Sequence, residues 1–381
     1  MRFATKKLQI CCILALGQAL PGCDGSTTRS APDNTGIRLL ADAPSNAGFS
    51  MATEVIDFVF PRDHGSHDAF ATEWWYFTGN LESATGRHFG FELTFFRYAL
   101  STQPVDRDSR WGSNQAWLAH FALTDTNRNT MYIDERYGRG AIGIAQASDD
   151  RLDVRLKDWS ARSLPGDIAV QLQAASNDAG MQLELRQIAE IALHGDRGLD
   201  RKGGGTGNAS YYYSIPRFEV SGTVETPEEP MLEVTGTAWL DREWATSSLE
   251  AEVEGWDWFG LQLNDGRSLM LYRLRNADGS GTPFSSGTLI RRDGTTEGLQ
   301  PDDIEYRVLR RWRSPATGVS YPVEWHVEIP RHELSMKVTP RIDAQEMNLG
   351  VRYWEGAVTV SAMAGETPVA GVGYLELAGY R

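Results

Sequence analysis

The chain has 381 residues, of which 41% are hydrophobic, and its formal net charge is −14. This length suggests two domains, each able to bury a core. The acidic charge argues against binding to nucleic acid and against electrostatic attachment to anionic lipid. Any contact with a membrane must therefore come from an anchor and not from surface charge.

The first 22 residues have the layout of an export signal. Three basic residues precede an apolar stretch over residues 8–19, which is too short to be a permanent transmembrane helix. The stretch ends in Leu20-Pro21-Gly22-Cys23, which resembles the lipobox of bacterial lipoproteins. We therefore expect residues 1–22 to be a lipoprotein signal peptide, Cys23 to be lipidated, and the anchored protein to face the periplasm. A plain signal peptide that ends near a cysteine is the alternative.

Cysteine usage agrees with lipidation. The three cysteines, Cys11, Cys12 and Cys23, lie at or before the expected cleavage point, so the mature protein has no pair of thiols for a disulfide. An exported fold without disulfides depends on its hydrophobic core. Residues 23–53 are rich in Ser, Thr, Asn, Gly, Ala and Pro, and we expect a flexible tether there.

From about residue 54 onward, apolar and polar residues alternate in short stretches separated by turn residues. Every second residue from Phe89 to Phe95 is apolar, and residues 117–123 repeat this pattern, so each set shares one face of an expected strand. No segment longer than two helical turns has apolar residues at the spacing of an amphipathic helix. The pattern therefore predicts an all-β fold, either a sandwich or a barrel.

The second half of the chain resembles the first half. Residues 73–77 (EWWYF) and residues 255–259 (GWDWF) each lead to a Gly-Arg turn and then to a strand that ends in arginine. We infer two similar β domains, at residues 54–225 and 231–381, joined by the proline-containing residues 226–230. The alternative is that aromatic strands with glycine turns look alike without a common origin.

Several aromatic segments identify a family. Seven of them, taken in order, resemble the AttH-like, carotenoid 1,2-hydratase-related proteins: Glu73–Gly79, Thr94–Arg97, Ala119–Ala122, Trp239–Trp244, Gly255–Phe259, Tyr353–Gly356 and Gly373–Leu377. The resemblance runs from about Phe58 to Tyr380. It implies two lipocalin-like antiparallel β-barrel domains of the calycin superfamily, and a hydrophobic ligand that is often isoprenoid- or lipid-like. Activity varies among these relatives, so the resemblance implies a fold more directly than a reaction.

The segment WLDREW, residues 239–244, contains the candidate catalytic acid. In a strand, Trp239, Asp241 and Glu243 share one face. Burial beside aromatic rings would raise the pKa of the Asp241 carboxyl, and a protonated acid can hydrate an alkene by donating its proton to the double bond. The resemblance implies the same role for Asp241. The alternative is a structural ion pair between Asp241 or Glu243 and an arginine.

Other candidate residues come from neighbouring strands. Glu73 and Trp75 share one face of an expected strand, and we expect Glu73 at the rim of an apolar cavity and Trp75 in its wall. The alternative is that Glu73 pairs with Arg97 and that the tryptophans belong to a hydrophobic core. His120 is a candidate for assisting proton transfer near neutral pH. The alternative is that it is a buried residue whose ring nitrogens are hydrogen-bonded within the core. The remaining candidate ligand contacts are Tyr213, a hydroxyl donor or an ordinary strand residue, and the tryptophans Trp258 and Trp354.

No metal or cofactor is expected. Residues 63–68 (DHGSHD) contain metal-binding residue types, but no second His or Cys cluster completes a tetrahedral site, so we expect a loop. Residues 138–143 (GRGAIG) match the dinucleotide fingerprint in letters, but no βαβ unit surrounds them. The sequence has no GxSxG elbow and no HExxH helix, so nothing supports a serine or zinc hydrolase.

These observations favour a protein that binds an apolar isoprenoid- or lipid-like molecule in a cavity lined by Trp75, Trp239 and Trp258. Hydration or isomerisation of that molecule through Asp241 is one form of this function. Two alternatives remain open: a lipid-binding or transfer lipoprotein without chemistry, and a scaffold for a membrane complex such as a transporter. A salt bridge from Asp241 to an arginine would favour the first alternative, and an exposed apolar patch would favour the second.

Overall fold

The described part of the protein begins after the expected export signal. The computed structural model describes residues 48–103, 109–166, 169–247 and 249–381, all within one compact unit, Asn34–Arg381. The expected signal peptide, Cys23 and most of the expected tether lie outside the described residues. Within the described ranges, no helix is long and apolar enough to cross a membrane.

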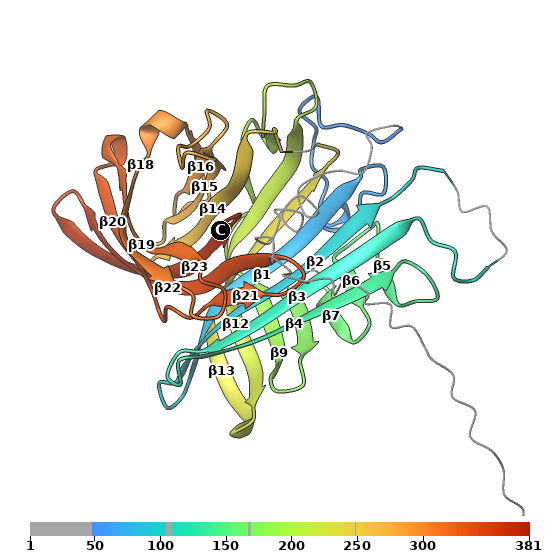
Figure 1. The fold of residues 1–381 in the computed structure, drawn as a ribbon, viewed down its shortest axis with the longest axis horizontal. Helices are drawn as coiled ribbons and strands as arrows, with labels where there is room; N and C mark the ends of the chain where they lie inside the picture. Colours follow the sequence, from blue (N-terminus) through green and yellow to red (C-terminus); the bar gives the residue numbers. More distant parts are fainter. Residues whose placement is uncertain (1–47, 104–108, 167–168, 248) are drawn as a thin grey trace, which may run out of the picture. The chain divides into compact units, whose positions relative to one another are not determined.

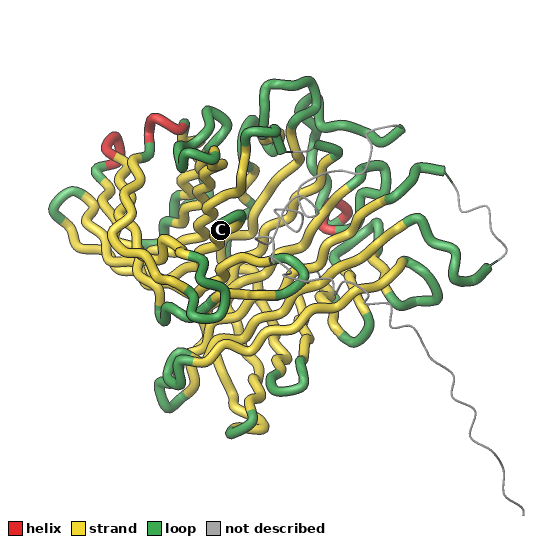
Figure 2. Tube along the Cα trace, viewed as in Figure 1, coloured by secondary structure: helices red, strands yellow, loops and turns green. Residues whose placement is uncertain are grey.

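Strands make up almost all of the regular structure (Figure 1, Figure 2), so the predicted all-β fold is confirmed. They form two antiparallel sheets, one 13-stranded and one 10-stranded. The helices of the described residues are single 3-10 turns: η1 (Arg62–His64), η2 (Pro301–Asp303) and η3 (Pro330–His332).

The first sheet curls into a nearly closed barrel. Phe121 of β3 and Trp159 of β7 meet across its interior, with ring centroids 5.7 Å apart. The strand order is β4-β3-β2-β1-β13-β12-β9-β8-β7-β6-β5, and β10 and β11 also pair with β12. Its strands are β1 (Thr72–Ser83), β2 (His88–Ala99), β3 (Gln115–Asp125), β4 (Thr130–Arg139), β5 (Ala145–Ala147), β6 (Asp153–Leu156), β7 (Trp159–Ser163), β8 (Ala169–Ala175), β9 (Gly180–Gln187), β10 (Ala192–Leu193), β11 (Leu199–Arg201), β12 (Ala209–Thr226) and β13 (Glu229–Ala245).

The second sheet forms a half-barrel. Its strand order is β17-β16-β15-β14-β23-β22-β20-β19-β18, and β21 pairs with β22. The strands are β14 (Val253–Leu263), β15 (Ser268–Asn276), β16 (Ser286–Ile290), β17 (Thr296–Leu299), β18 (Glu305–Arg313), β19 (Ser320–Ile329), β20 (Leu334–Pro340), β21 (Glu346–Asn348), β22 (Arg352–Ala364) and β23 (Thr367–Ala378).

The chain passes from the first sheet to the second between Ala245 and Val253. The junction expected at residues 226–230 lies instead in the hairpin between β12 and β13. These residues have the composition of a linker, but β13 continues beyond them along both β1 and β12. Backbone pairing on both sides therefore keeps β13 in the first sheet.

The central strands of the first sheet are buried on both faces. As predicted, every second residue from Phe89 to Phe95 and from Trp117 to Leu123 lies in the core of the barrel. The opposite face of this sheet packs against the second sheet. At Gly90 of β2 the two sheets come so close that a Cβ atom would lie 2.6 Å from the Cβ atom of Ala357 in β22. The absence of a side chain at Gly90 therefore permits this contact.

A buried ion cluster ties the central strands together. Glu73 of β1 accepts hydrogen bonds from Arg97 of β2 and from Arg242 of β13. All three side chains are almost fully buried. Arg242 also lies over the ring of Trp75, with 3.9 Å between its guanidinium carbon and the ring centroid. Burial alone would raise the pKa of Glu73, but the two arginines hold that pKa well below its usual range.

Replacing this carboxylate, Glu73→Gln, should lower the free energy of unfolding by about 3 kcal/mol or more, because two buried arginines lose their counter-charge. A carboxyl with a lowered pKa contributes stability that is lost as the pH falls through that pKa. The difference between wild type and variant should therefore persist at neutral pH and shrink only in acid below 4.5, the ordinary pKa of a glutamate. Urea unfolding over a series of pH values measures it.

The matched control is Glu82→Gln, which changes an exposed glutamate of the same strand. It should alter the free energy of unfolding by less than about 0.5 kcal/mol. Equal effects of the two substitutions would contradict the structural role of Glu73.

Candidate active site

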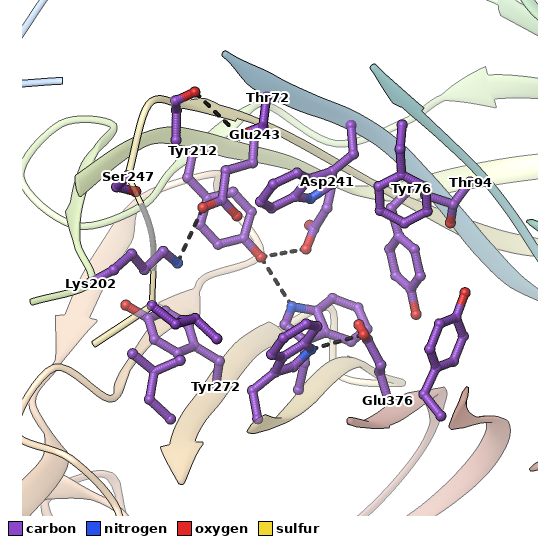
Figure 3. Close-up of a pocket in the computed structure, with 18 of the residues that line it drawn as sticks. Thr72, Tyr76, Thr94, Lys202, Tyr212, Asp241, Glu243, Ser247, Tyr272 and Glu376 are labelled. Carbon is purple, nitrogen blue, oxygen red and sulfur yellow. Dashed lines mark hydrogen bonds and ion pairs between the residues drawn. The ribbon is translucent and has the colours of Figure 1, made fainter. Parts of the chain in front are cut away.

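An aromatic cavity lies between the two sheets (Figure 3). Its walls come from β1, β2, β12 and β13 of the first sheet and from β14, β15, β22 and β23 of the second. The volume of this cavity, which is partly open to solvent, is about 140 Å³. A cavity of roughly 150 Å³ holds benzene in another protein, so this space suits one ring or one prenyl double bond. Its large apolar side chains include Trp74, Tyr76, Trp256 and Trp258.

Asp241 of β13 faces the cavity and accepts three hydrogen bonds. The donors are the hydroxyl groups of Tyr212 and Ser214 and the indole N–H of Trp239, the last at 2.5 Å. Burial raises the pKa of Asp241 to about 6, while the three donors and the charge of Lys202 oppose that rise. The three donors therefore favour the ionised form of a carboxyl that burial would otherwise keep neutral.

The nearby cations bind other carboxylates. Arg242 lies on the opposite face of β13 and pairs with Glu73, so the alternative of an Asp241–Arg242 pair does not hold. Lys202 lies 3.4 Å from Glu243 (Figure 3). Burial raises the pKa of Glu243 to about 7, and Lys202 opposes this rise. Asp241 is thus held by neutral donors, whereas Glu243 has a cationic partner.

Two glutamates face the cavity from the second sheet, Glu376 of β23 and Glu355 of β22. The indole N–H of Trp256 donates to Glu376 at 2.8 Å, and the hydroxyl of Tyr76 donates to Glu355 at 2.9 Å. Burial raises the pKa of Glu376 to about 8, with a further contribution from the charge of Asp241. At neutral pH, Asp241 is therefore mainly ionised and Glu376 mainly protonated.

A buried histidine lies behind Asp241. His194, which follows β10, contacts Ser214 through Nε2 at 2.6 Å and Thr288 of β16 through Nδ1 at 2.8 Å. Because Ser214 gives its one hydroxyl proton to Asp241, Ser214 accepts the proton of Nε2–H, and Nδ1 accepts the proton of Thr288. Burial lowers the pKa of His194 to about 3, so its ring is neutral, as this pattern requires. Hydrogen bonds thus connect the second sheet to Asp241.

Some of the residues predicted from the sequence meet at this cavity. Trp239 lies beside Trp258, with ring centroids 6.1 Å apart. His120 is buried behind the cavity wall, where its Nδ1 atom is hydrogen-bonded to the hydroxyl group of Tyr353. Burial lowers the pKa of His120 to about 3, so its ring is neutral. The predicted residues that line the cavity itself are Asp241, Glu243 and Trp258.

Other predicted residues lie elsewhere. Trp75 was expected to line the cavity, but it points into the core of the barrel and its neighbours Trp74 and Tyr76 face the second sheet instead. Alternation along β1 explains the difference, because the outer face of the sheet carries the cavity. Glu73 pairs with Arg97, which was the alternative to a rim position.

The same alternation separates Tyr213 from the cavity. Tyr213 packs inside the barrel, and its neighbour Tyr212 reaches Asp241. Trp354 lies in the core of the second sheet, where its indole N–H donates to the backbone oxygen of Asp343 at 2.8 Å. Neither predicted residue therefore contacts the space between the sheets.

Sequence reasoning missed several residues of the site, among them Lys202, His194, Ser214, Glu355 and Glu376. Glu376 belongs to one of the segments that resemble the family, Gly373–Leu377. A carboxyl beside aromatic residues in such a segment could have been recognised as a candidate site residue. Lys202 and His194 lie in irregular connections, where no periodic pattern marks a functional position. Only the folded chain brings them to Asp241.

The segment DHGSHD forms η1 and a loop, as expected, and contributes to the end of the barrel. The ring of His67 stacks on Trp244, with centroids 3.7 Å apart, and the indole N–H of Trp75 donates to the backbone oxygen of His64 at 2.9 Å. The described part of the chain contains no group of three His, Cys, Asp or Glu side chains that could hold a metal ion.

The fold and the cavity define a β protein of two packed sheets with an aromatic, acidic site between them. Residues 51–380 match the family described as AttH-like, and the chain therefore belongs to that family. A crystal structure of an AttH protein from Nitrosomonas europaea is 35% identical, with a TM-score of 0.78, and the match covers 87% of this chain and 100% of that one.

Two named relatives catalyse addition or removal of water. Kievitone hydratase of Fusarium solani subsp. phaseoli is 23% identical over 269 residues, which are 68% of this chain and 74% of the relative. Dehydratase asqC of Emericella nidulans is 25% identical over 226 residues, 55% of this chain and 60% of the relative. The crystal structure of kievitone hydratase from Nectria haematococca has a TM-score of 0.66 at 15% identity and covers 89% of this chain and 98% of that one. The chain therefore has a hydratase-like fold.

Removing one donor to Asp241, Ser214→Ala, should raise the pKa of that carboxyl above its value of about 6. The reason is that the ionised form loses one of its three hydrogen bonds. Carbon-13 NMR of labelled aspartate carboxyls, followed through a pH titration, measures the shift. Ser247→Ala, in the same cavity but outside these hydrogen bonds, is the control and should leave the pKa of Asp241 unchanged. An unchanged pKa in Ser214→Ala would show that its hydroxyl does not stabilise the carboxylate.

Proposed function

We propose that this protein is a hydratase or dehydratase that acts on an apolar, unsaturated molecule held between its two sheets. One observation carries the proposal: two carboxyls with pKa values on either side of 7, Asp241 and Glu376, face one aromatic cavity. Such a pair supplies a proton acceptor and a proton donor at neutral pH. The similarity to a hydratase and to a dehydratase supports the same class of reaction.

In this proposal the two carboxyls have distinct roles. The donor role expected for Asp241 from the sequence passes to Glu376, because three donors favour the ionised form of Asp241. Glu376 receives one hydrogen bond, from Trp256, and its side chain is partly exposed. Burial also raises the pKa of Glu355, but this side chain is almost fully buried, so we assign the donor role to the more accessible Glu376.

The reaction balances with these two groups. Glu376 gives its proton to one carbon of the double bond, and a carbocation forms at the other carbon. The faces of aromatic residues such as Trp258 stabilise this cation. The oxygen of a water molecule then bonds to the cation while Asp241 takes the released proton. Return of a proton from Asp241 to Glu376 through solvent restores the starting state, and dehydration is the same sequence in reverse.

The cavity limits what part of a substrate is enclosed. Its volume of about 140 Å³ suits a ring or a single isoprene unit and not a whole long-chain molecule. The proposed substrate is therefore an isoprenoid-like or aromatic molecule whose reacting double bond enters the cavity. Lys202 lies over the ring of Tyr272 at 4.0 Å and would orient a polar substituent at that side of the site.

Two isosteric substitutions test the roles. Asp241→Asn and Glu376→Gln keep side-chain shape but remove the proton acceptor and the proton donor, so turnover should fall by a factor of about 10² or more in each. Affinity for the apolar molecule and the melting temperature should barely change. The substrate is first sought by mass spectrometry of apolar compounds that copurify with the protein, and turnover is then followed by oxygen-18 incorporation from water.

The matched control is Asp278→Asn, an aspartate in an exposed turn of the second sheet, which should keep full turnover. If wild type binds an apolar molecule but incorporates no oxygen-18, the non-catalytic lipid-binding function replaces this proposal. If Asp241→Asn loses stability and binding together, the residue is structural and the assignment fails.

We also propose that the protein is a lipid-anchored, periplasm-facing lipoprotein, on the basis of the basic start, the apolar stretch and the segment ending at Cys23. Cys23→Ala should therefore release the protein from membranes, because the acyl chains of the anchor provide the attachment. Intact-mass measurement of the membrane fraction checks the modification. An unmodified Cys23, or cleavage at another residue, would contradict this location.

A further inference from the structure

One end of the barrel is where the described chain begins. β1 begins and β13 ends there, with Thr72 opposite Ala245, and β2 ends beside them. Gly48 lies against the loop that follows β2, since a Cβ atom at Gly48 would be 2.9 Å from the side-chain oxygen of Thr102. Residues 24–47, which lead from the expected lipid anchor, therefore join the fold at this end, which we call the tether end.

The cavity between the sheets opens at the tether end. Four of its lining residues that belong to strands are partly exposed: Trp74, Phe96, Trp256 and Glu376. Each lies within three residues of a terminus of its strand, and these termini are together, because β14 follows the short connection from β13 and the end of β23 lies beside its start. Farther along the strands, Tyr76, Asp241 and Trp258 are buried. A molecule therefore enters the cavity from the side of the tether end.

Three large apolar side chains are exposed in loops of the tether end (Figure 1). Leu100 and Trp111, in the loop between β2 and β3, are 52% and 61% exposed, and Ile142, after β4, is 46% exposed. The two loops lie side by side, because the backbone N–H of Gly140 donates to the backbone oxygen of Gln115 at 3.4 Å. Exposed apolar side chains near the opening of an apolar cavity indicate contact with another apolar phase.

A lipid bilayer is the apolar phase that this end can reach. Tryptophan favours the interface between water and lipid, and the exposed Arg110 beside Trp111 can extend its apolar stem along the lipid and its charge to the phosphates. A flexible chain as long as residues 24–47 has a root-mean-square end-to-end distance of roughly 27 Å, so a lipid anchor keeps the tether end close to the membrane. This proximity raises the local concentration of lipid, and a few apolar contacts then suffice.

We propose that the tether end rests on the lipid bilayer, with Leu100, Trp111 and Ile142 in the membrane interface and the opening of the cavity directed at the lipid. The net charge of −14 leaves apolar contact, and not attraction to anionic lipid, as the cause. An apolar substrate then passes from the bilayer to the cavity without exposing its surface to water. The docking rests on the proposed lipid anchor, and it deepens the proposed function by naming the bilayer as the source of the substrate.

Fluorescent labels test this orientation in the full, anchored protein. The sequence has cysteines only at positions 11, 12 and 23, so after removal of the signal peptide and lipidation an introduced cysteine is the one free thiol. The vesicles are phosphatidylcholine that contains a nitroxide-labelled phosphatidylcholine as quencher. A nitrobenzoxadiazole label at Trp111→Cys should be quenched severalfold more than the same label at Met231→Cys. Met231 is 72% exposed but lies at the opposite end of β13, so equal quenching at the two positions would overturn the proposal.

Sedimentation of the vesicles separates this result from that of the anchor. Protein that sediments but shows no quenching at residue 111 is anchored and not docked, which overturns the docking alone. Protein that stays in the supernatant overturns the anchor and the docking together. A label at residue 111 that is shielded from aqueous iodide, but not quenched by the lipid nitroxide, would indicate a second copy of the chain on this surface and would also overturn the proposal.

Leu100→Ser combined with Trp111→Ser tests whether the apolar side chains cause the docking. Both side chains are more than half exposed, so the melting temperature should barely change. Lipid quenching of a label at Ile142→Cys should nevertheless fall severalfold, while the protein still sediments with the vesicles. The matched control is Met231→Ser combined with Met363→Ser, two exposed apolar side chains at strand ends away from the tether end, which should leave the quenching unchanged. Undiminished quenching in the first double variant would overturn the proposal.

Discussion

The buried pairing of Glu73 with Arg97 and Arg242 determines how the central strands of the first sheet lie. It ties β1 to both of its neighbours, β2 and β13, and it occupies the inner face of these strands. Side chains alternate along a strand, so fixing Glu73 and Arg242 inward fixes their neighbours outward. Because Arg242 points into the barrel, its neighbour Asp241 points outward and reaches the interface between the sheets. The ion cluster and the candidate active site therefore lie on opposite faces of the same strands.

Packing two sheets against each other also explains the unusual electrostatics of the cavity. Carboxyls from both sheets are buried there, and Lys202 is the cation that lines the space with them. Burial raises the pKa of each carboxyl, and local hydrogen bonds then separate the values. Asp241 has three donors and a pKa of about 6, whereas Glu376 has one donor and a pKa of about 8. The difference between them follows from the number of donors, from the charge of Lys202 near Asp241, and from the charge that Asp241 places on Glu376.

The sequence was sufficient for the all-β fold, because alternation of apolar residues is a local property that survives in the barrel core. It was also sufficient for the outward face of β13, where Trp239, Asp241 and Glu243 do lie together. It misassigned Trp75, because alternation tells which residues share a face but not which face meets a second sheet. It could not bring His194 or Lys202 to Asp241, since these contacts join segments far apart in the chain. The hairpin at residues 226–230 resembled a linker because composition does not reveal that β13 pairs on both sides.

The central claim is that Glu376 is protonated and Asp241 ionised at neutral pH in one cavity. Infrared difference spectra at pH 7 test it most directly, since protonated and ionised carboxyls absorb in separate regions. Subtracting the spectrum of Glu376→Gln from that of wild type should reveal a band of a protonated carboxyl, and subtracting that of Asp241→Asn should reveal bands of a carboxylate. A carboxylate signal assigned to Glu376, or a protonated signal assigned to Asp241, would contradict the account.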